Sequence, residues 1–478
     1  MKGSIGTSAT TTRVLKALSI FGGAQALGVI CAVVRTKVTA VLIGPAGVGI
    51  LAVLVSTMDL LTTISQLSLR QSAVRDLSAK QSDESRQRIT GIVRRLALLL
   101  GIFGLMTAVV LSPFLSRWGF GNSDYILSFV CLAPMLLFSS VAGGETAIMQ
   151  GYDKLGGVAK SSVYSALTGV AVSIPLLYFF RVDGLVPVLL TYSFCLFAFS
   201  LKFGVHTGHR VKISTIEALK DGKSILGLGI YMTLSTTFSM MSAYLFVVFL
   251  NHNYDESTVG IFQSGYTLIN SYVGIIFTAI AVEFYPRLSS VIGHTKRAEV
   301  IVSHEIKIAM SVLVPLVLIF ASFAWLAIKI LYTSSFEAVL PFVTIGMTGC
   351  MFRAISWCMA FVILAKGDGK IYLWSESLSA VLYLVLFVVL FRHMGFLGLG
   401  IAYTLWYLAY TVIIYLIYRR RYGMRLRGGT RRLCIAGLAT GIAGVVLSHT
   451  LWLYAPMILL VAVAIVFKFK IKNRPKNN

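Results

Sequence analysis

Residues 35–49 read RTKVTAVLIGPAGVG and join two long apolar segments. The segments run near Val14–Ile43 and Val48–Leu69, and each reaches the roughly 20 residues that a helix needs to cross a bilayer. Between them, Gly44 and Pro45 mark a short turn. The stretch therefore predicts a hairpin of two membrane-spanning helices, with two basic residues inside the first of them.

The composition of the whole chain points the same way. Of its 478 residues, 57% are hydrophobic and only 13% are charged, whereas ordinary soluble domains carry about 25% charged residues. A soluble domain this apolar would have no surface to present to water, but lipid accepts apolar side chains on every side of a helix. The sequence thus predicts an all-α integral membrane protein and argues against a soluble enzyme.

Apolar segments of spanning length recur along the chain, and we expect about fourteen transmembrane helices. The thirteenth segment is short, and it could form a tight pair with the fourteenth. The segments run near Val14–Ile43, Val48–Leu69, Ile92–Leu115, Tyr125–Met149, Val158–Phe180, Leu185–Val205, Ser224–Leu250, Val259–Tyr285, Ile306–Leu331, Ala338–Ala365, Ile371–Phe391, Phe396–Tyr418, Leu433–Ser448 and Trp452–Phe467.

The basic residues, which give the chain a formal net charge of +24, follow these segments. Of the 42 Lys and Arg residues, 35 lie at the two termini or in the connections after even-numbered segments. Connections rich in Lys and Arg stay in the cytoplasm, so both termini are expected inside. The basic residues form no stripe on a soluble face, which argues against a nucleic-acid partner.

A weak internal repeat divides the chain. Val48-Gly49-Ile50 opens the second segment, Val259-Gly260-Ile261 opens the eighth, and at the same offset Asp59 falls on Asn270. Transporters built from such repeats bind their substrate between the two halves. The expected organisation is a six-helix lobe at residues 10–210, a second six-helix lobe at 220–422, two additional transmembrane helices at 430–470 and a basic cytoplasmic tail at 471–478.

Charged residues within the segments are candidates for a substrate site, because a charge at the bilayer centre costs about 2.5–3.5 kcal/mol on insertion scales. Three cations, Arg35, Lys37 and Arg353, stand there against one carboxylate, Asp59. A cavity with net positive charge suits a phosphate or a pyrophosphate rather than a cationic drug. The alternative for each residue is structural, such as a snorkelling side chain or an ion pair of Asp59 with Arg35 or Arg353.

Other charged residues lie near the predicted cytoplasmic ends of the segments. Arg70 is either an ordinary positive-inside residue or a ligand of the substrate. Glu145, Glu283 and Glu376 are expected to be solvated helix ends, with a role as proton carriers as the alternative. The candidate substrate-binding residues are Arg35, Lys37, Asp59, Arg70, Glu283 and Arg353.

No pattern in the sequence supports catalysis. There is no GxxxxGK[ST] phosphate loop, so the chain is not expected to hydrolyse ATP. Neither the 7 histidines nor the 6 cysteines have the spacing of metal ligands. No connection is long enough for a soluble domain. We therefore expect no cofactor, no metal and no enzymatic activity.

Three short motifs resemble those of Wzx-type O-antigen flippases, in the polysaccharide-transporter branch of the MATE-like MOP superfamily. They are the hairpin Arg35–Gly49, the turn Gln150–Lys154 (QGYDK) and the turn Ala365–Lys370 (AKGDGK). In that family a basic residue of the first helix precedes a GPAGxG-type outer turn, and Lys37 sits at this position. The resemblance spans about residues 10–420. Many Wzx-type proteins have twelve transmembrane helices, and this chain is expected to have two more. Lipid II flippases of the same superfamily have fourteen transmembrane helices.

The resemblance implies a substrate and a location. Wzx-type proteins move an undecaprenyl-diphosphate-linked oligosaccharide from the cytoplasmic to the periplasmic leaflet of the bacterial inner membrane. Basic residues in a cavity can hold the diphosphate while the prenyl tail stays in lipid, and alternating access then carries the head group across. The further partners implied are a polysaccharide polymerase and a coupling H⁺ or Na⁺.

Two alternatives stay open at this point. A MATE-type multidrug exporter would need carboxylates, not cations, as its essential cavity residues. A membrane-embedded glycosyltransferase or ligase would normally carry a large periplasmic loop with acidic or histidine clusters, and the sequence has none.

Substituted-cysteine labelling in a cysteine-free background tests the topology. We predict that Ser82→Cys, in the basic Arg70–Arg95 connection, reacts only after the membrane is opened. A cysteine in the Asn251–Ser257 connection should react from outside, because that connection carries neither Lys nor Arg. Labelling of Ser82→Cys from the outside contradicts this map.

Overall fold

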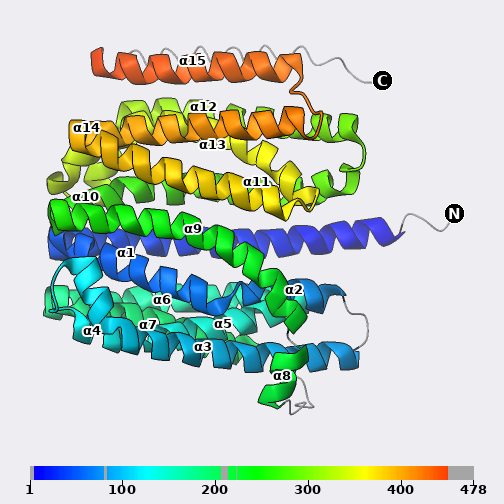
Figure 1. Cartoon of the computed structure of the whole chain (residues 1–478), viewed down its shortest axis with the longest axis vertical. Helices are drawn as coiled ribbons and strands as arrows, with labels where there is room; N and C mark the ends of the chain where they lie inside the picture. Colours follow the sequence, from blue (N-terminus) through cyan, green and yellow to red (C-terminus); the bar gives the residue numbers. More distant parts are fainter. Residues whose placement is uncertain (1–4, 80–82, 206–213, 222, 451–478) are drawn as a thin grey trace. The chain divides into compact units, whose positions relative to one another are not determined.

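The computed structural model of the chain describes residues 5–79, 83–205, 214–221 and 223–450. Every regular element in these ranges is a helix (Figure 1). The chain divides into two compact units, Met1–Val259 and Gly260–Asn478. The division falls inside α10 (Glu256–Tyr266).

The first unit is built around its longest helix. That helix, α1, packs against α3, α6 and α9, while α5 packs against α2, α3 and α7. The bounds of these elements are α1 (Ile5–Gln66), α2 (Leu69–Ala79), α3 (Asp83–Phe120), α4 (Ile126–Leu132), α5 (Pro134–Gly151), α6 (Leu155–Phe180), η1 (Arg181–Gly184), α7 (Leu185–Phe203), α8 (Thr215–Asp221) and α9 (Lys223–Asn253).

The predicted hairpin turn is a break within α1. Gly44 has φ 66° and ψ −172°, a conformation that only glycine adopts readily. Pro45 follows, where its fixed φ suits the first turn of the next helical segment. Nη1 of Arg181 donates a hydrogen bond to the carbonyl of Leu42 at 2.9 Å and so satisfies a helix-end acceptor beside the break.

Gly49, the last glycine of the hairpin motif, is required for a different reason. A Cβ at this position would lie 1.8 Å from the carbonyl oxygen of Glu256. The backbone at the start of α10 therefore passes directly over Gly49. Gly28, earlier in α1, has nothing within 4 Å of the corresponding point.

In the second unit, α13 packs closely against both α12 and α14, and α15 packs against α12. Small residues allow the approach of α13 and α14, since a Cβ at Gly349 would lie 2.6 Å from a ring carbon of Tyr403. The bounds are η2 (Thr267–Tyr272, a π-helix), α11 (Val273–Val291), α12 (Thr295–Leu331), η3 (Ser334–Val339), α13 (Leu340–Ala365), α14 (Gly369–Arg420) and α15 (Gly428–Thr450).

The helices confirm the predicted all-α membrane fold. Seven helical stretches of the described residues are long and apolar enough to cross a bilayer. Some of them hold two predicted segments, as α14 does on either side of Gly395, where φ is 57°. The fourteenth predicted segment, near Trp452–Phe467, lies outside the described residues.

The two predicted six-helix lobes stay a prediction. The compact units divide at Val259, whereas the repeat in the sequence places the second lobe at 220–422. Helix α9, which the sequence assigns to the start of the second lobe, packs here against α1, α2 and α3.

Replacement of Gly49 by alanine tests the close approach of α10. We predict that Gly49→Ala lowers stability by about 1–3 kcal/mol, the usual cost of overpacking, because a backbone atom must move. The measurement is thermal unfolding of the purified protein in detergent. Gly28→Ala is the matched control in the same helix and should leave the melting temperature unchanged or slightly higher. Equal effects of the two substitutions would rule out the close approach.

Candidate functional site

Arg353, in the middle of α13, is held by neutral hydrogen-bond partners. Its Nη1 donates to Oδ1 of Asn270 at 2.6 Å and to the hydroxyl of Tyr403 at 3.4 Å. The Tyr403 hydroxyl in turn donates to the same Asn270 oxygen at 3.3 Å. Three elements of the second unit, η2, α13 and α14, thus meet around one half-buried guanidinium group.

Aromatic rings provide the rest of its surroundings. The guanidinium carbon of Arg353 lies 5.0 Å from the ring centroid of Phe277 and 5.7 Å from that of Tyr407. Tyr403 and Tyr407 are one turn apart on α14, with ring centroids 4.9 Å apart. A cation over an aromatic face gains about 0.5–2 kcal/mol, and the ring does not neutralise its charge.

The local backbone explains how Asn270 reaches this arginine. Asn270 belongs to the π-helix η2, between α10 and α11. A π-helical turn holds one residue more than an α-helical turn, and such turns are frequent at functional sites. On the facing helix, the Cys350 thiol lies one turn before Arg353 and donates to the carbonyl of Ile269 at 3.9 Å.

The charge of Arg353 has no counter-ion within the part of the chain that the structure describes. The partners of its guanidinium group there are an amide, a phenol and two rings. Both hydrogen bonds use Nη1, so Nε and Nη2 donate none to the described residues. A half-buried guanidinium group with two free nitrogens can bind an anion through paired hydrogen bonds.

In the first unit the candidate residues lie along α1. Arg35 is half-buried, and its guanidinium carbon lies 5.3 Å from the ring centroid of Tyr192 on α7. Lys37 is also half-buried. The Asp59 side chain is exposed and makes no ion pair with any described residue. Arg35 and Asp59 therefore form no ion pair in the described structure, and Arg35 packs on the ring of Tyr192 instead.

Arg70 and Glu283 complete the set of candidates. Arg70 is exposed near the start of α2, just after Leu67 and Ser68, whose φ values are 46° and 49°. Glu283 belongs to α11, and its side chain lies outside the described part of the chain.

The expectation that Glu145 is a solvated helix end is wrong. Its carboxylate is only 3% exposed and accepts from Nε of Arg94 at 2.6 Å and from Nη2 at 3.0 Å. Nη2 of Arg94 also donates to the carbonyl of Val205 at 2.9 Å, just beyond α7. This pair of a half-buried arginine and a buried glutamate ties α3, α5 and the end of α7 together. Glu376 is half-buried and accepts a hydrogen bond from Tyr410.

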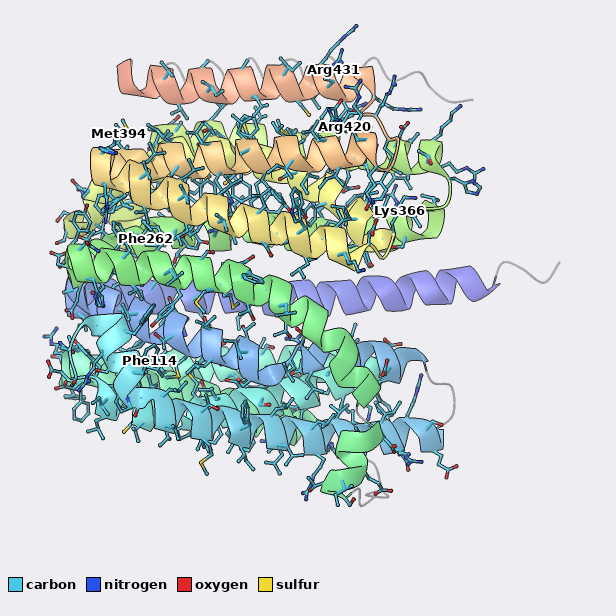
Figure 2. The ribbon with its side chains drawn as sticks, in the orientation of Figure 1. Phe114, Phe262, Lys366, Met394, Arg420 and Arg431 are labelled. Atoms are coloured by element: carbon cyan, nitrogen blue, oxygen red, sulfur yellow. The ribbon has the colours of Figure 1, made fainter. Side chains whose placement is uncertain are left out.

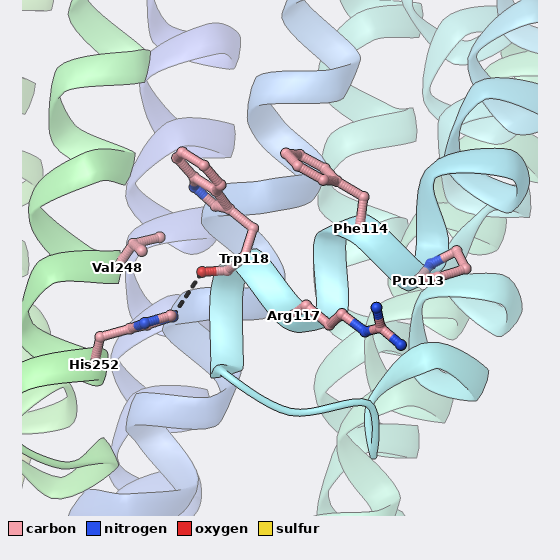
Figure 3. Close-up of a pocket in the computed structure, with 6 residues that line it drawn as sticks. All are labelled: Pro113, Phe114, Arg117, Trp118, Val248 and His252. Carbon is pink, nitrogen blue, oxygen red and sulfur yellow. Dashed lines mark hydrogen bonds between the residues drawn. The ribbon is translucent and has the colours of Figure 1, made fainter.

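A pocket of about 550 Å³ lies in the first unit between α3 and α9 (Figure 3). His252 points towards Trp118 and donates to its carbonyl at 2.8 Å, while Arg117 extends away from both. Nε of Arg117 donates to Ser123 at 3.2 Å. The walls are mainly apolar and aromatic, and the pocket's arginine is already hydrogen-bonded. Arg117 is exposed and extends away from the pocket's histidine, whereas Arg353 is half-buried in the middle of a helix that is long and apolar enough to cross a bilayer.

The sequence located Arg353 but not its partners. Tyr403, Tyr407 and Phe277 look like ordinary aromatic residues of apolar helices, and no spacing separates them from the other aromatic residues. Asn270 did carry a signal, because the internal repeat aligns it with Asp59.

A family model described as "Polysaccharide biosynthesis protein" matches residues 14–292, which is more than half of the chain. This range includes Arg35, Lys37 and Asn270, and it ends before Arg353. No curated protein matches the chain.

Solved structures match almost the whole chain at low sequence identity. The lipid II flippase MurJ in an inward closed conformation has a TM-score of 0.70 at 13% identity, covering 95% of this chain and 98% of its own. An inward-facing MATE-family multidrug resistance transporter of the MOP superfamily has a TM-score of 0.71 at 14% identity. The match covers 85% of this chain and 96% of the transporter's chain. A MOP-superfamily transporter from Pyrococcus furiosus has a TM-score of 0.58 at 15% identity. The match covers 85% of this chain and 96% of the transporter's chain.

These sequence identities are too low to infer the substrate of this chain from that of its structural neighbours, but the matches cover both compact units. The shared architecture is that of membrane transporters, in agreement with the long apolar helices. The chain belongs to the polysaccharide biosynthesis protein family and has the fold of the MurJ and MATE transporters.

Proposed function

We propose that this protein is a flippase that moves an undecaprenyl-diphosphate-linked oligosaccharide from the cytoplasmic to the periplasmic leaflet of the bacterial inner membrane. The observation that carries the proposal is Arg353, a cation in a membrane-spanning helix whose described partners are all neutral. A diphosphate is the kind of anion that such a group would bind. Membership of the polysaccharide biosynthesis family supports a glycan as the cargo.

In this proposal Arg353 binds the diphosphate together with Arg35 or Lys37. The two free nitrogens of Arg353 provide a fork for phosphate oxygens, and the cation of α1 contributes a second charge. Arg70 would bind the substrate where it enters from the cytoplasm. Asp59, with its exposed carboxylate, is assigned to coupling by H⁺ or Na⁺, and Glu283 is retained as a weaker candidate for the same role.

In the proposed transport cycle, the prenyl tail stays in lipid while the protein shields the charged head group, because a diphosphate does not cross hydrocarbon unaided. The two predicted lobes would alternate between conformations open to each side. A polysaccharide polymerase on the periplasmic side would then receive the product. MurJ, whose fold this chain shares, is a lipid II flippase, and this supports a lipid-linked cargo here.

A MATE-type multidrug exporter is the second candidate, since one inward-facing MATE structure has a TM-score of 0.71, against 0.70 for MurJ. The exposed carboxylate of Asp59 is the observation that favours it. An exporter of cationic drugs would depend on that carboxylate and would tolerate the loss of Arg353.

Deletion of the gene distinguishes the two functions. We predict that surface polysaccharide disappears and that lipid-linked repeat units accumulate on the cytoplasmic side, because their diphosphate cannot cross without a carrier. The measurements are surface glycan staining and extraction of the lipid-linked intermediates. Intact surface glycan with a raised sensitivity to cationic dyes would instead establish the drug exporter.

Substitutions at Arg353 and Asn270 test the site itself. Arg353→Ala should abolish complementation of the deletion strain at normal expression, and Arg353→Lys should retain part of it, because the charge survives without the fork. Asn270→Asp should also lower complementation. It places a carboxylate of the same size 2.6 Å from Nη1 and so neutralises the cation. Membrane abundance is measured for every variant.

The Asn270→Asp variant separates anion binding from a structural role. If Arg353 only stabilised the fold, an ion pair at this position would leave transport and abundance intact. Normal transport by stably expressed Asn270→Asp and Arg353→Ala proteins would therefore exclude the proposed site. Arg297→Ala, at an exposed arginine of α12, is the matched control and should complement fully.

A further inference from the structure

The segment 419–432, which runs from the end of α14 to the first turns of α15, has an unusual set of basic residues. It carries seven arginines and no lysine, and all seven side chains are exposed. Figure 2 shows Arg420, Arg431 and Lys366 at the same end of the second unit. The arginines are Arg419, Arg420, Arg421, Arg425, Arg427, Arg431 and Arg432.

The backbone of this arginine segment is fixed to the helix beside it. The N–H of Arg425 donates to Oε1 of Glu299 at 2.7 Å, and the N–H of Arg427 donates to the Ser303 hydroxyl at 3.3 Å. Thr430 donates to the carbonyl of Ser303 at 3.2 Å. Met424 is fully buried. The arginines are therefore displayed from an ordered backbone, which reduces the entropy lost when they bind a ligand.

Only one arginine of the segment is used in an ion pair with a described residue. Nε of Arg421 donates to the Asp368 carboxylate at 3.0 Å, and the Tyr422 hydroxyl donates to it at 3.0 Å. These bonds favour the ionised carboxylate and lower the pKa of Asp368 below its usual value. The other six guanidinium groups have no acceptor among the described residues.

The basic connection of the first unit is different. There Arg88 pairs with Asp221 at 2.7 Å, Arg95 donates to Thr215 at 2.8 Å, and Arg94 holds the buried Glu145. Those arginines use their donors within the protein. The arginine segment keeps its donors exposed although its backbone is ordered.

Membrane topology alone does not explain this composition, because lysine and arginine serve equally in keeping a connection in the cytoplasm. Arginine differs from lysine in its planar fork, which binds phosphate through two parallel hydrogen bonds. A cluster of four to eight basic residues beside a membrane-spanning helix is typical of binding sites for anionic lipids.

We propose that residues 419–432 bind the phosphate groups of anionic phospholipids in the cytoplasmic leaflet. The segment joins two helices expected to span the membrane, so it lies at the level of the lipid head groups. Its forks extend from the end of α14 to the first turns of α15, an arrangement that suits several head groups rather than one diphosphate. The inference does not rest on the proposed transport function.

Lipid binding by the purified full-length protein tests the proposal. Thermal unfolding is followed while phosphatidylglycerol or phosphatidylethanolamine is added to the detergent, and bound lipids are identified by native mass spectrometry. We expect tighter binding of phosphatidylglycerol, weakened by added salt. The Arg420→Gln/Arg431→Gln variant should bind it more weakly by a factor on the order of ten or more, since each arginine near an anionic surface adds about 1 kcal/mol. The corresponding lysine variant should lose less, because the charges remain.

The matched control is Lys154→Gln/Lys160→Gln, which removes two exposed cations from the predicted cytoplasmic side of the first unit. It should bind phosphatidylglycerol like the unaltered protein. Equal losses in the two double variants, or equal binding of the two phospholipids, would overturn the proposal. Displacement of phosphatidylglycerol by a stoichiometric amount of undecaprenyl diphosphate would also overturn it, because the segment would then bind the lipid-linked substrate.

Discussion

Hydrocarbon offers no hydrogen-bond partners to the peptide backbone, and this constraint determines how the chain can fold. Each crossing must be a helix that satisfies its own N–H and C=O groups, so the chain can turn sharply only between crossings. At Gly44 and Gly395 two crossings meet almost without a loop, and glycine supplies the positive φ that the reversal requires. The free carbonyl of Leu42 beside the first break is bonded by Arg181.

The same constraint makes every charge within a crossing expensive. Placing an arginine at the bilayer centre costs about 2.5–3.5 kcal/mol on insertion scales. A hydrogen bond to a charged group returns about 1.5–3 kcal/mol, and a desolvated cation–π contact returns about 2 kcal/mol. The bond of Arg353 to Asn270 and its contact with Phe277 are therefore enough to offset its insertion without a carboxylate. The positive charge stays available to a ligand.

The helical crossings and the partners of a buried charge differ in how well the sequence predicts them. The helices could be predicted because an apolar run of spanning length is a local property, and each of the first thirteen predicted ranges contains a helix. The surroundings of a charge depend on the rotation of its helix and on which neighbour it faces. Glu145 is near a helix end, which suggests solvent, yet it faces Arg94 and is buried. Asn270 could be aligned with Asp59, but its bond to Arg353 could not be predicted, because that bond depends on how η2 lies against α13.

Both units hold a candidate cation against an aromatic ring. Arg35 lies over Tyr192, and Arg353 lies over Phe277 and Tyr407. For a carrier this support has a kinetic advantage over an ion pair. A cation paired with a carboxylate would have to break a strong contact before binding an anion, whereas an aromatic face stays in contact while the free nitrogens bind. When the anion leaves, the cation is still supported, so release does not strand an unpaired charge. Aromatic and amide partners thus suit the proposed site, which would bind a diphosphate on one side of the membrane and release it on the other.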